Sequence, residues 1–174
     1  MNFRKIPHPL IWIVAAGILL VAGGSIYYLR NMTDEAKIRD VLETLCDIGT
    51  KSGEGAAATA LKLKSLEKIF APEVDINLDD RIFAGKVKQT ELTGDVVRFR
   101  AIFDRVKIGM RDLEIKVEGP EQAEAVFTGS LDGVGKSGGG VGTVSEVRDI
   151  FCKLEKIDGD WKINSLSVQN ILQK

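Results

Sequence analysis

A single apolar stretch near the N-terminus constrains this chain more than any other feature. It reads LIWIVAAGILLVAGGSIYYL from Leu10 to Leu29 and holds no ionisable side chain apart from its tyrosines. A helix rises about 1.5 Å per residue, so roughly 20 apolar residues cross the hydrocarbon core of a bilayer. We therefore predict a cytoplasmic tail at residues 1–9, a transmembrane helix at 10–29 and one folded domain at 30–174.

The charges that flank this stretch predict its orientation. Arg4 and Lys5 precede it, whereas Asp34 and Glu35 follow it closely, and Lys and Arg favour the cytoplasmic side of a membrane. The expected location is therefore the cell inner membrane, with the N-terminus cytoplasmic and the domain periplasmic. A cleaved signal peptide is the alternative, because Ala22–Gly24 offers small residues after the apolar middle. The apolar run continues beyond them, which favours a signal-anchor.

The charge balance and the scarcity of histidine exclude several functions. The chain has 24 basic and 25 acidic residues, which gives no excess positive charge for nucleic acid. Its one histidine is His8, on the predicted cytoplasmic tail, and it has two cysteines. Zinc sites need several His or Cys ligands, and Ser or Cys nucleophiles usually need a histidine base. We therefore expect no metal and no cofactor.

Three stretches after residue 32 have the spacing of apolar residues that predicts amphipathic helices, in which apolar side chains recur every three or four positions. The expected extents are 34–49 after an N-cap at Thr33, 56–70 before Pro72, and a third helix that begins at a Thr93 cap, continues through Val106 and closes at Gly109.

The remaining segments alternate apolar and polar residues, as strands do. The expected strands are Val74–Leu78, Leu113–Val117, Ala123–Leu131, Val144–Ile157 and Trp161–Val168. Gly119-Pro120 and Asp158-Gly159 are turn signals, and a slip of the apolar phase at Ser165 indicates a bulge. Three helices followed by a meander of strands define an α+β fold, with the helices packed on one face of a curved antiparallel sheet.

Two segments resemble a known superfamily. They are LEKIFAPEV at Leu66–Val74 and FCKLEKIDGDWKI at Phe151–Ile163. With the order of elements, they make the chain from about Thr33 to Leu172 similar to the nuclear transport factor 2-like superfamily, which includes SnoaL-like cyclases and ketosteroid isomerase. The resemblance implies a cystatin-like cone, a bent sheet wrapped around three helices. Because the superfamily includes enzymes, binding modules and scaffolds, it does not define an activity.

The isomerase branch implies three catalytic groups, and this sequence matches one of them. The position of the base falls on Leu78, with Asp79 beside it, and the first helix has no tyrosine. Asp149 matches the acid on a late strand. It is a candidate acid-base group if its side chain lies in an apolar cavity. Otherwise it belongs to an exposed charge pattern with Arg148 and Lys153.

The two cysteines leave two possibilities open. Cys46 lies at the edge of the first helix's apolar stripe, and Cys152 lies in the middle of a strand. Outside the cytoplasm such a pair can form a disulfide. Two buried thiols that pack as small apolar side chains are the alternative.

These observations favour a membrane-anchored binding module over an enzyme. The expected partner is a protein, a second copy of the chain contacting through the sheet face, or a small apolar ligand. A cytoplasmic stub, one span and an outward domain of this fold is also the layout of the inner-membrane scaffold component of type IV secretion systems, although no specific motif is shared. The alternative is a SnoaL-like lyase, isomerase or cyclase that uses Asp149 as its acid-base group, assisted by Asp75 or Asp79. Carboxylates that converge in a cavity would favour the enzyme, and a cone filled by apolar side chains would favour the binding module.

Overall fold

The computed structural model describes residues 33–79, 83–136 and 142–169. Within these ranges the order of elements is the α+β order expected from the sequence. The elements are α2 (Asp34–Gly49), α3 (Ala56–Ile69), β1 (Phe70–Asp79), β2 (Phe83–Lys88), α4 (Gln89–Ile102), β3 (Phe103–Val117), β4 (Gln122–Gly135), β5 (Thr143–Ile157) and β6 (Asp160–Gln169).

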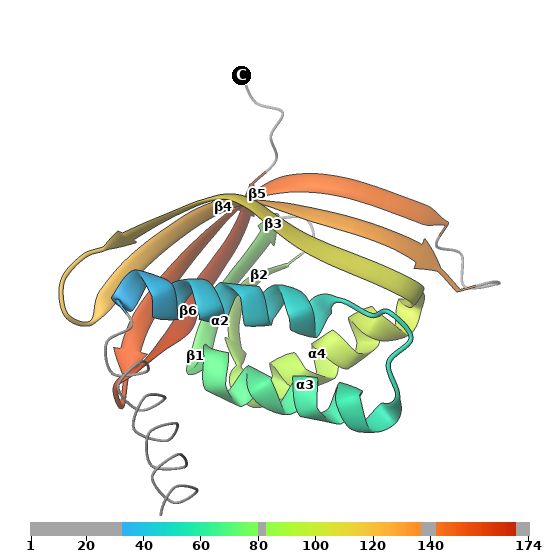
Figure 1. The fold of residues 1–174 in the computed structure, drawn as a ribbon, viewed down its shortest axis with the longest axis horizontal. Coiled ribbons are helices and arrows are strands. Elements are labelled where there is room, and N and C mark those ends of the chain that lie inside the picture. The colour runs from blue at the N-terminus through green and yellow to red at the C-terminus, as the bar shows by residue number, and fades with distance from the viewer. Residues whose placement is uncertain (1–32, 80–82, 137–141, 170–174) are drawn as a thin grey trace, which may run out of the picture. The chain divides into compact units, whose positions relative to one another are not determined.

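The strands form one curved sheet, and the helices lie on one side of it (Figure 1). The strand order is β2-β1-β6-β5-β4-β3. The pairing is antiparallel except between β1 and β6, which run parallel. The sheet is therefore mixed rather than wholly antiparallel as predicted. The parallel pair arises because the chain leaves β2, crosses through α4 to the far edge at β3, and returns along the meander to β1.

The boundary between the third helix and the following strand was predicted wrongly. The helix α4 starts at Gln89 with Lys88 as its N-cap residue, so Thr93 lies inside the helix. It ends at Ile102, and Val106 and Gly109 lie in β3. The apolar residues of this segment fit either a helix or a strand. Pairing with β4, and a bridge from Lys51 to Val106, stabilise the strand.

Two further differences concern the region around Pro72. The helix α3 ends at Ile69, three residues before Pro72, and the proline itself lies within β1. The strand β1 is therefore longer than the predicted Val74–Leu78. The edge strand β2 was not predicted, because Val87 is its only core side chain among Ala84–Lys88 and the apolar signal is too short to stand out.

The predicted turn and bulge near the C-terminus are confirmed. Asp158 and Gly159 have φ values of 53° and 88°, which a two-residue hairpin of type I′ requires. In the β5–β6 ladder Leu154 pairs with Ile163, but Lys153 pairs with Ser165, so one residue is left over between them. This is the bulge that the phase slip predicts.

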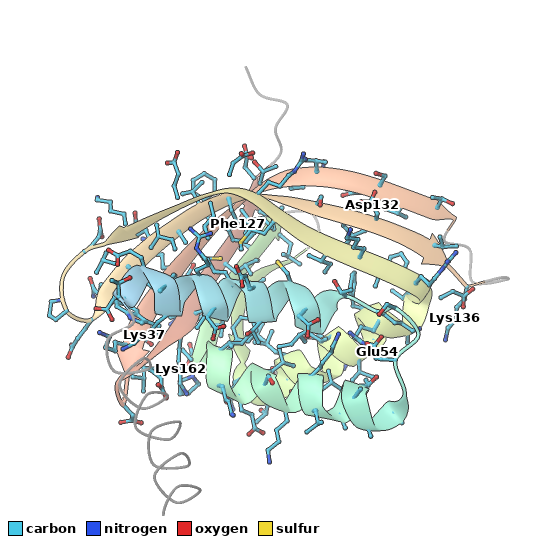
Figure 2. The ribbon with its side chains drawn as sticks, in the orientation of Figure 1. Lys37, Glu54, Phe127, Asp132, Lys136 and Lys162 are labelled. Atoms are coloured by element: carbon cyan, nitrogen blue, oxygen red, sulfur yellow. The ribbon has the colours of Figure 1, made fainter. Side chains whose placement is uncertain are left out.

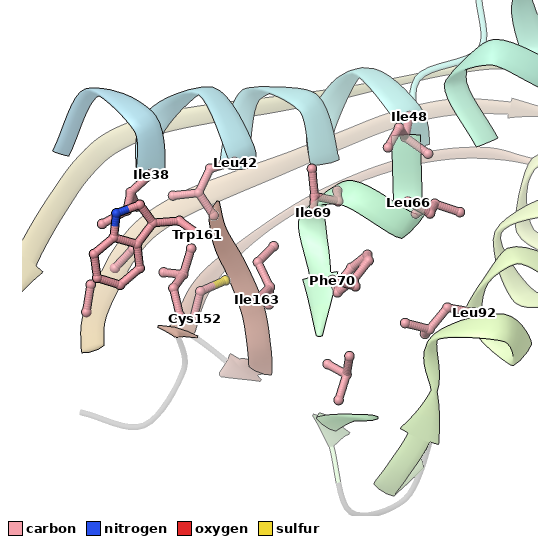
Figure 3. Packing of buried hydrophobic residues seen from close by; sticks show 14 of the residues in the cluster. Ile38, Leu42, Ile48, Leu66, Ile69, Phe70, Leu92, Cys152, Trp161 and Ile163 are labelled. Carbon is pink, nitrogen blue, oxygen red and sulfur yellow. The ribbon is translucent and has the colours of Figure 1, made fainter. Parts of the chain in front are cut away.

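The core lies between the helices and the concave side of the sheet (Figure 3). From α2, Ile38 and Leu42 are 0% exposed, as the helical spacing predicts. They pack in one cluster with Trp161 and Ile163 of β6, which are 2% and 0% exposed. The concave side of the sheet is therefore covered where the helices cross it.

No helix in the described ranges is long and apolar enough to cross a membrane. The predicted span at residues 10–29 lies outside the described residues, so the anchor stays a prediction.

Candidate functional site

The two sides of the sheet differ, and we name them by their residues. The inner face is the side toward the helices, and it carries Phe127 and Ile150, which are cross-strand partners. The outer face is the opposite side, and it carries the neighbouring pairs Val126 with Phe151, Thr128 with Asp149 and Ser130 with Val147. Side chains alternate along a strand, so these two sets point in opposite directions.

The inner face is filled by apolar side chains. Ala125, Phe127 and Cys152 are 1%, 2% and 1% exposed. At Gly133 the Phe103 ring lies over the position where a side chain would begin, with the nearest ring carbon 2.7 Å from an added Cβ. The inner face therefore leaves little room beside these residues.

Arg100 is the only charged side chain that is buried in the described part of the chain, at 5% exposure. Its guanidinium donates to the backbone carbonyls of Ile48 and Thr50, and it forms an ion pair with Glu54. Lys51 in turn donates through Nζ to the Arg100 carbonyl, at 3.2 Å. These contacts connect the end of α2 and the α2–α3 loop to α4.

Glu54 is strongly held in its charged form. The backbone N–H of Ser52 and the Arg100 guanidinium lower the pKa of Glu54 to about 2, against the opposing effect of burial. The pairing of Arg100 with Glu54 was not predicted from the sequence. The available signal was the position of Arg100, four residues after Val96 and three before Phe103, inside the helix's apolar stripe.

A second polar cluster fixes the start of α2. Asp34 accepts hydrogen bonds from Lys156 Nζ at 2.8 Å and from Trp161 Nε1 at 2.9 Å. Lys156 also lies 4.7 Å from the centre of the Trp161 ring. The Lys156 and Trp161 hydrogen bonds lower the pKa of Asp34. The first turn of the domain is thereby bound to β5 and β6.

The structure places Asp149 on the outer face, away from the apolar interior. Its side chain is half-buried and accepts a hydrogen bond from Thr128 Oγ1 at 3.3 Å. Asp79 is the last residue of β1, and its side chain lies outside the described part. The structure therefore does not bring Asp149 and Asp79 together in a described cavity, and their catalytic roles stay predictions.

Cys46 and Cys152 are both free thiols in the structure. Burial, with a smaller contribution from neighbouring Cys46, raises the pKa of Cys152 to about 12. Burial also raises the pKa of Cys46. Since the thiolate is the reactive form, neither is a nucleophile near neutral pH. Their predicted disulfide stays a prediction. Among the described residues, no three His, Cys, Asp or Glu side chains group as metal ligands would.

The outer face combines exposed apolar side chains with cations that lack an ion pair. Val147 is 38% exposed and Phe151 37%, one on each side of Asp149 along β5. At the edge of the sheet, β3 carries Arg105 and Lys107, both exposed, and neither has a salt bridge within the described ranges.

A groove lies at one end of this outer face. Its volume is about 640 Å³, and it crosses the α2–α3 loop and the ends of β3, β4 and β5. The lining residues are Thr50–Ser52, Arg105–Lys107, Asp132–Val134 and Thr143–Ser145. The groove and the apolar patch around Phe151 are the candidate functional site.

No protein-family profile matches the sequence, and no curated protein matches it. Solved structures do match. A protein from Kribbella flavida superposes with a TM-score of 0.65 at 11% identity, covering 81% of this chain and 93% of that one. A hexachlorocyclohexane dehydrochlorinase superposes with a TM-score of 0.61 at 14% identity, covering 78% and 83%. A protein of unknown function from Nostoc punctiforme, described as having a cystatin-like fold, superposes with a TM-score of 0.55 at 14% identity. The match covers 78% of this chain and 89% of that one.

These matches confirm the fold that the resemblance implies. The chain has the cystatin-like fold that the resemblance implies. At these identities the similarity concerns the fold alone. The catalytic chemistry of a similar structure does not carry over, because function depends on the residues of each site.

Proposed function

We propose that the chain is a membrane-anchored, extracytoplasmic binding domain that holds a partner protein on the outer face of its sheet. The observation that carries this proposal is the exposed pair Val147 and Phe151, on the side of the sheet opposite to α2, α3 and α4 (Figure 1). The two residues share one face of β5, and Val126 lies beside Phe151 as its cross-strand partner. Apolar side chains exposed together on one face are typical of protein interaction surfaces.

The packed inner face supports the same proposal. A small apolar ligand or a substrate needs an enclosed space, and ligand pockets usually measure a few hundred Å³ or more. Phe127, Trp161 and Cys152 occupy the inside of the cone with 1–2% exposure. A protein partner on the outer face is therefore favoured over a small molecule inside the cone.

Site-specific photo-crosslinking in cells tests the surface. The full chain would carry p-benzoylphenylalanine at position 151 or 147 in separate variants. The control is position 61 on α3, where Leu61 is 70% exposed. We expect a discrete crosslinked product from 151 and 147 and none from 61. A product of twice the chain's mass would identify the partner as a second copy.

Two outcomes would contradict the proposed surface. One is equal crosslinking from position 61, which would show that contact follows exposure alone. The other is no product from either outer-face position, which would leave the outer face without a partner and favour the alternative, a SnoaL-like enzyme that uses Asp149.

The anchor needs a separate test on the full chain. We expect the protein to stay in the membrane pellet after extraction at high pH, and its domain to be digested by protease added from the extracytoplasmic side. A mature N-terminus that begins after Ala22–Gly24 would show instead that the segment is a cleaved signal peptide.

A further inference from the structure

The groove at the end of the outer face has two walls made of cross-strand neighbours. Lys51, Val106, Gly133 and Val144 form one row of paired residues across four neighbouring segments. The rows on either side form the walls. One wall holds Arg105, Val134 and Thr143, and the other holds Lys107, Asp132 and Ser145.

The walls belong to the outer face because the row between them faces inward. Val106 is 2% exposed, and the side-chain position of Gly133 is covered on the inside by Phe103. The residues before and after them along each strand therefore point outward. Figure 2 shows Asp132 on the side of β4 away from the helices, and Phe127 on the side toward them.

Strand geometry gives the groove its dimensions. Residues two apart on a strand are separated by about 6.6 Å, which sets the distance between the walls. Four segments at a spacing of about 4.8 Å give a length of about 14 Å. An extended peptide advances about 3.3 Å per residue, so four residues fill this length.

The charged side chains of the groove are distributed unevenly along its length, with the cations on β3 and the carboxylate on β4. Arg105 and Lys107 face each other across the β3 end, one from each wall, and neither has an ion pair in the described ranges. Asp132 is Lys107's cross-strand neighbour, but its carboxylate accepts a hydrogen bond from Ser145 at 2.7 Å. Beyond the cations, Val134 is 40% exposed. One end of the groove therefore favours a carboxylate, and the next position favours an apolar side chain.

We propose that this groove binds a short, extended acidic segment of the partner protein, with a carboxylate between Arg105 and Lys107 and an apolar side chain on Val134. This inference rests on the proposed function, since it names the chemistry of the partner bound on the outer face. Cations and carboxylates that meet at a partly enclosed surface form charge-assisted hydrogen bonds, which are stronger than neutral ones. The groove's length fits a strand-like peptide of about four residues.

The test measures binding of a defined probe to the full chain in detergent. The probe is a fluorescent six-residue peptide of alternating Glu and Leu, and the comparison is the same peptide with Gln in place of Glu. We expect saturable binding of the Glu peptide, weakened by salt because the contact is electrostatic. The Gln peptide is expected to bind at least about tenfold more weakly, the loss that one or two charge-assisted hydrogen bonds give.

A charge-reversed variant and a matched control locate the site. Arg105→Glu with Lys107→Glu is expected to weaken binding of the Glu peptide by about tenfold or more. Lys64→Glu with Lys68→Glu reverses two exposed lysines on α3 and is expected to leave binding unchanged. Circular dichroism of each variant checks that the fold is retained.

Four results would overturn the inference. The first three are no binding of the Glu peptide up to about 1 mM, the weak limit of a specific contact, equal binding of the Gln peptide, and equal loss in the α3 control. The fourth is binding to vesicles of anionic lipid as strong as to the peptide. If the Glu peptide never binds while position 151 still crosslinks, the groove is rejected and the proposed function stands. If the charge-reversed variant loses peptide binding while position 151 still crosslinks, the groove is supported and the partner is also held at Phe151.

Discussion

The inner and outer faces of the sheet are made from the same strands and yet have different roles. On β5, Cys152 and Leu154 point inward and are 1% exposed, whereas Val147 and Phe151 point outward and are 38% and 37% exposed. The inner residues belong to the core cluster that includes Ile38 and Leu42 of α2, and the outer ones lie on the side opposite to the described helices. The fold therefore depends on one face, and the other is available for a partner.

The difference also bears on the similar structures. The dehydrochlorinase shares this cone, so the architecture can host chemistry. In the present chain the one candidate acid that the structure describes, Asp149, lies on the outer face beside Thr128. In the packed core the inner face of β4 and β5 carries Phe127, Ile150 and Cys152. By the same alternation, Glu146 and Arg148 of β5 share that side of the sheet.

The largest expected effect comes from removing an aromatic ring on the inner face. Phe127→Ala should lower the free energy of unfolding by about 3–5 kcal/mol, because it leaves a cavity in a packed core. The matched change on the outer face, Phe151→Ala, should cost less than about 1 kcal/mol, since that ring is already partly in water. Urea unfolding followed by tryptophan fluorescence measures both. Equal losses would show that the outer face is covered in the folded protein.

Next in size is the buried ion pair. Arg100→Leu should destabilise the domain by about 3–5 kcal/mol, because Glu54 is left without its partner and two backbone carbonyls lose a donor. The control is Arg98→Leu on the same helix, whose side chain is 80% exposed and pairs with Asp95. That change should cost less than about 1 kcal/mol.

A double-mutant cycle separates the pair from its surroundings. The double variant combines Arg100→Leu with Glu54→Gln. If its loss in the free energy of unfolding equals the sum of the losses of the two single variants, the side chains are not coupled, and the proposed connection between α2 and α4 is wrong. A double variant that is more stable than the sum confirms the coupling.

Acid should weaken this connection before it affects the apolar inner face. The folded pKa of Glu54 is lowered to about 2 from its ordinary 4.5. Because the pKa of Glu54 is lower in the folded state than in the unfolded state, its charged form stabilises the fold fully above pH 4.5. This stabilisation declines as the pH falls from 4.5 toward 2 and is lost below pH 2. Urea unfolding between pH 7 and pH 2 measures this. Glu54→Gln should reduce the decline, and an unchanged decline would assign it to other carboxylates such as Asp34.

Much of the fold could be predicted from local patterns. The stripe of α2, the two residues Asp158 and Gly159, and the phase slip near Ser165 each act over a few neighbouring residues, so the sequence contains them directly. The outer position of Asp149 could not be decided this way. Val147 and Phe151 share its parity, and Ile150 and Cys152 have the opposite one, so apolar residues lie on both faces of this strand.

What the sequence did not reveal depends on contacts between distant segments. The residues from Phe103 to Met110 became a strand because β4 and Lys51 pair with them. The parallel pairing of β1 with β6 depends on the path of the whole chain. Arg100 of α4 pairs with Glu54 of the α2–α3 loop, 46 positions away in the sequence. No local pattern carries this information.

The smallest expected effect concerns Asp149 itself. Because its side chain is half-buried on the outer face and accepts one hydrogen bond of 3.3 Å from Thr128, Asp149→Asn should change the free energy of unfolding by no more than about 0.5 kcal/mol. Urea unfolding of Asp149→Asn measures the change, with Thr128→Val, which removes the donating hydroxyl, as a comparison. A loss in the free energy of unfolding above about 1.5 kcal/mol would show that the carboxylate is part of a buried network. If stability holds while crosslinking from position 151 weakens, the carboxylate contacts the partner, and Asp149 belongs to the binding surface of the outer face.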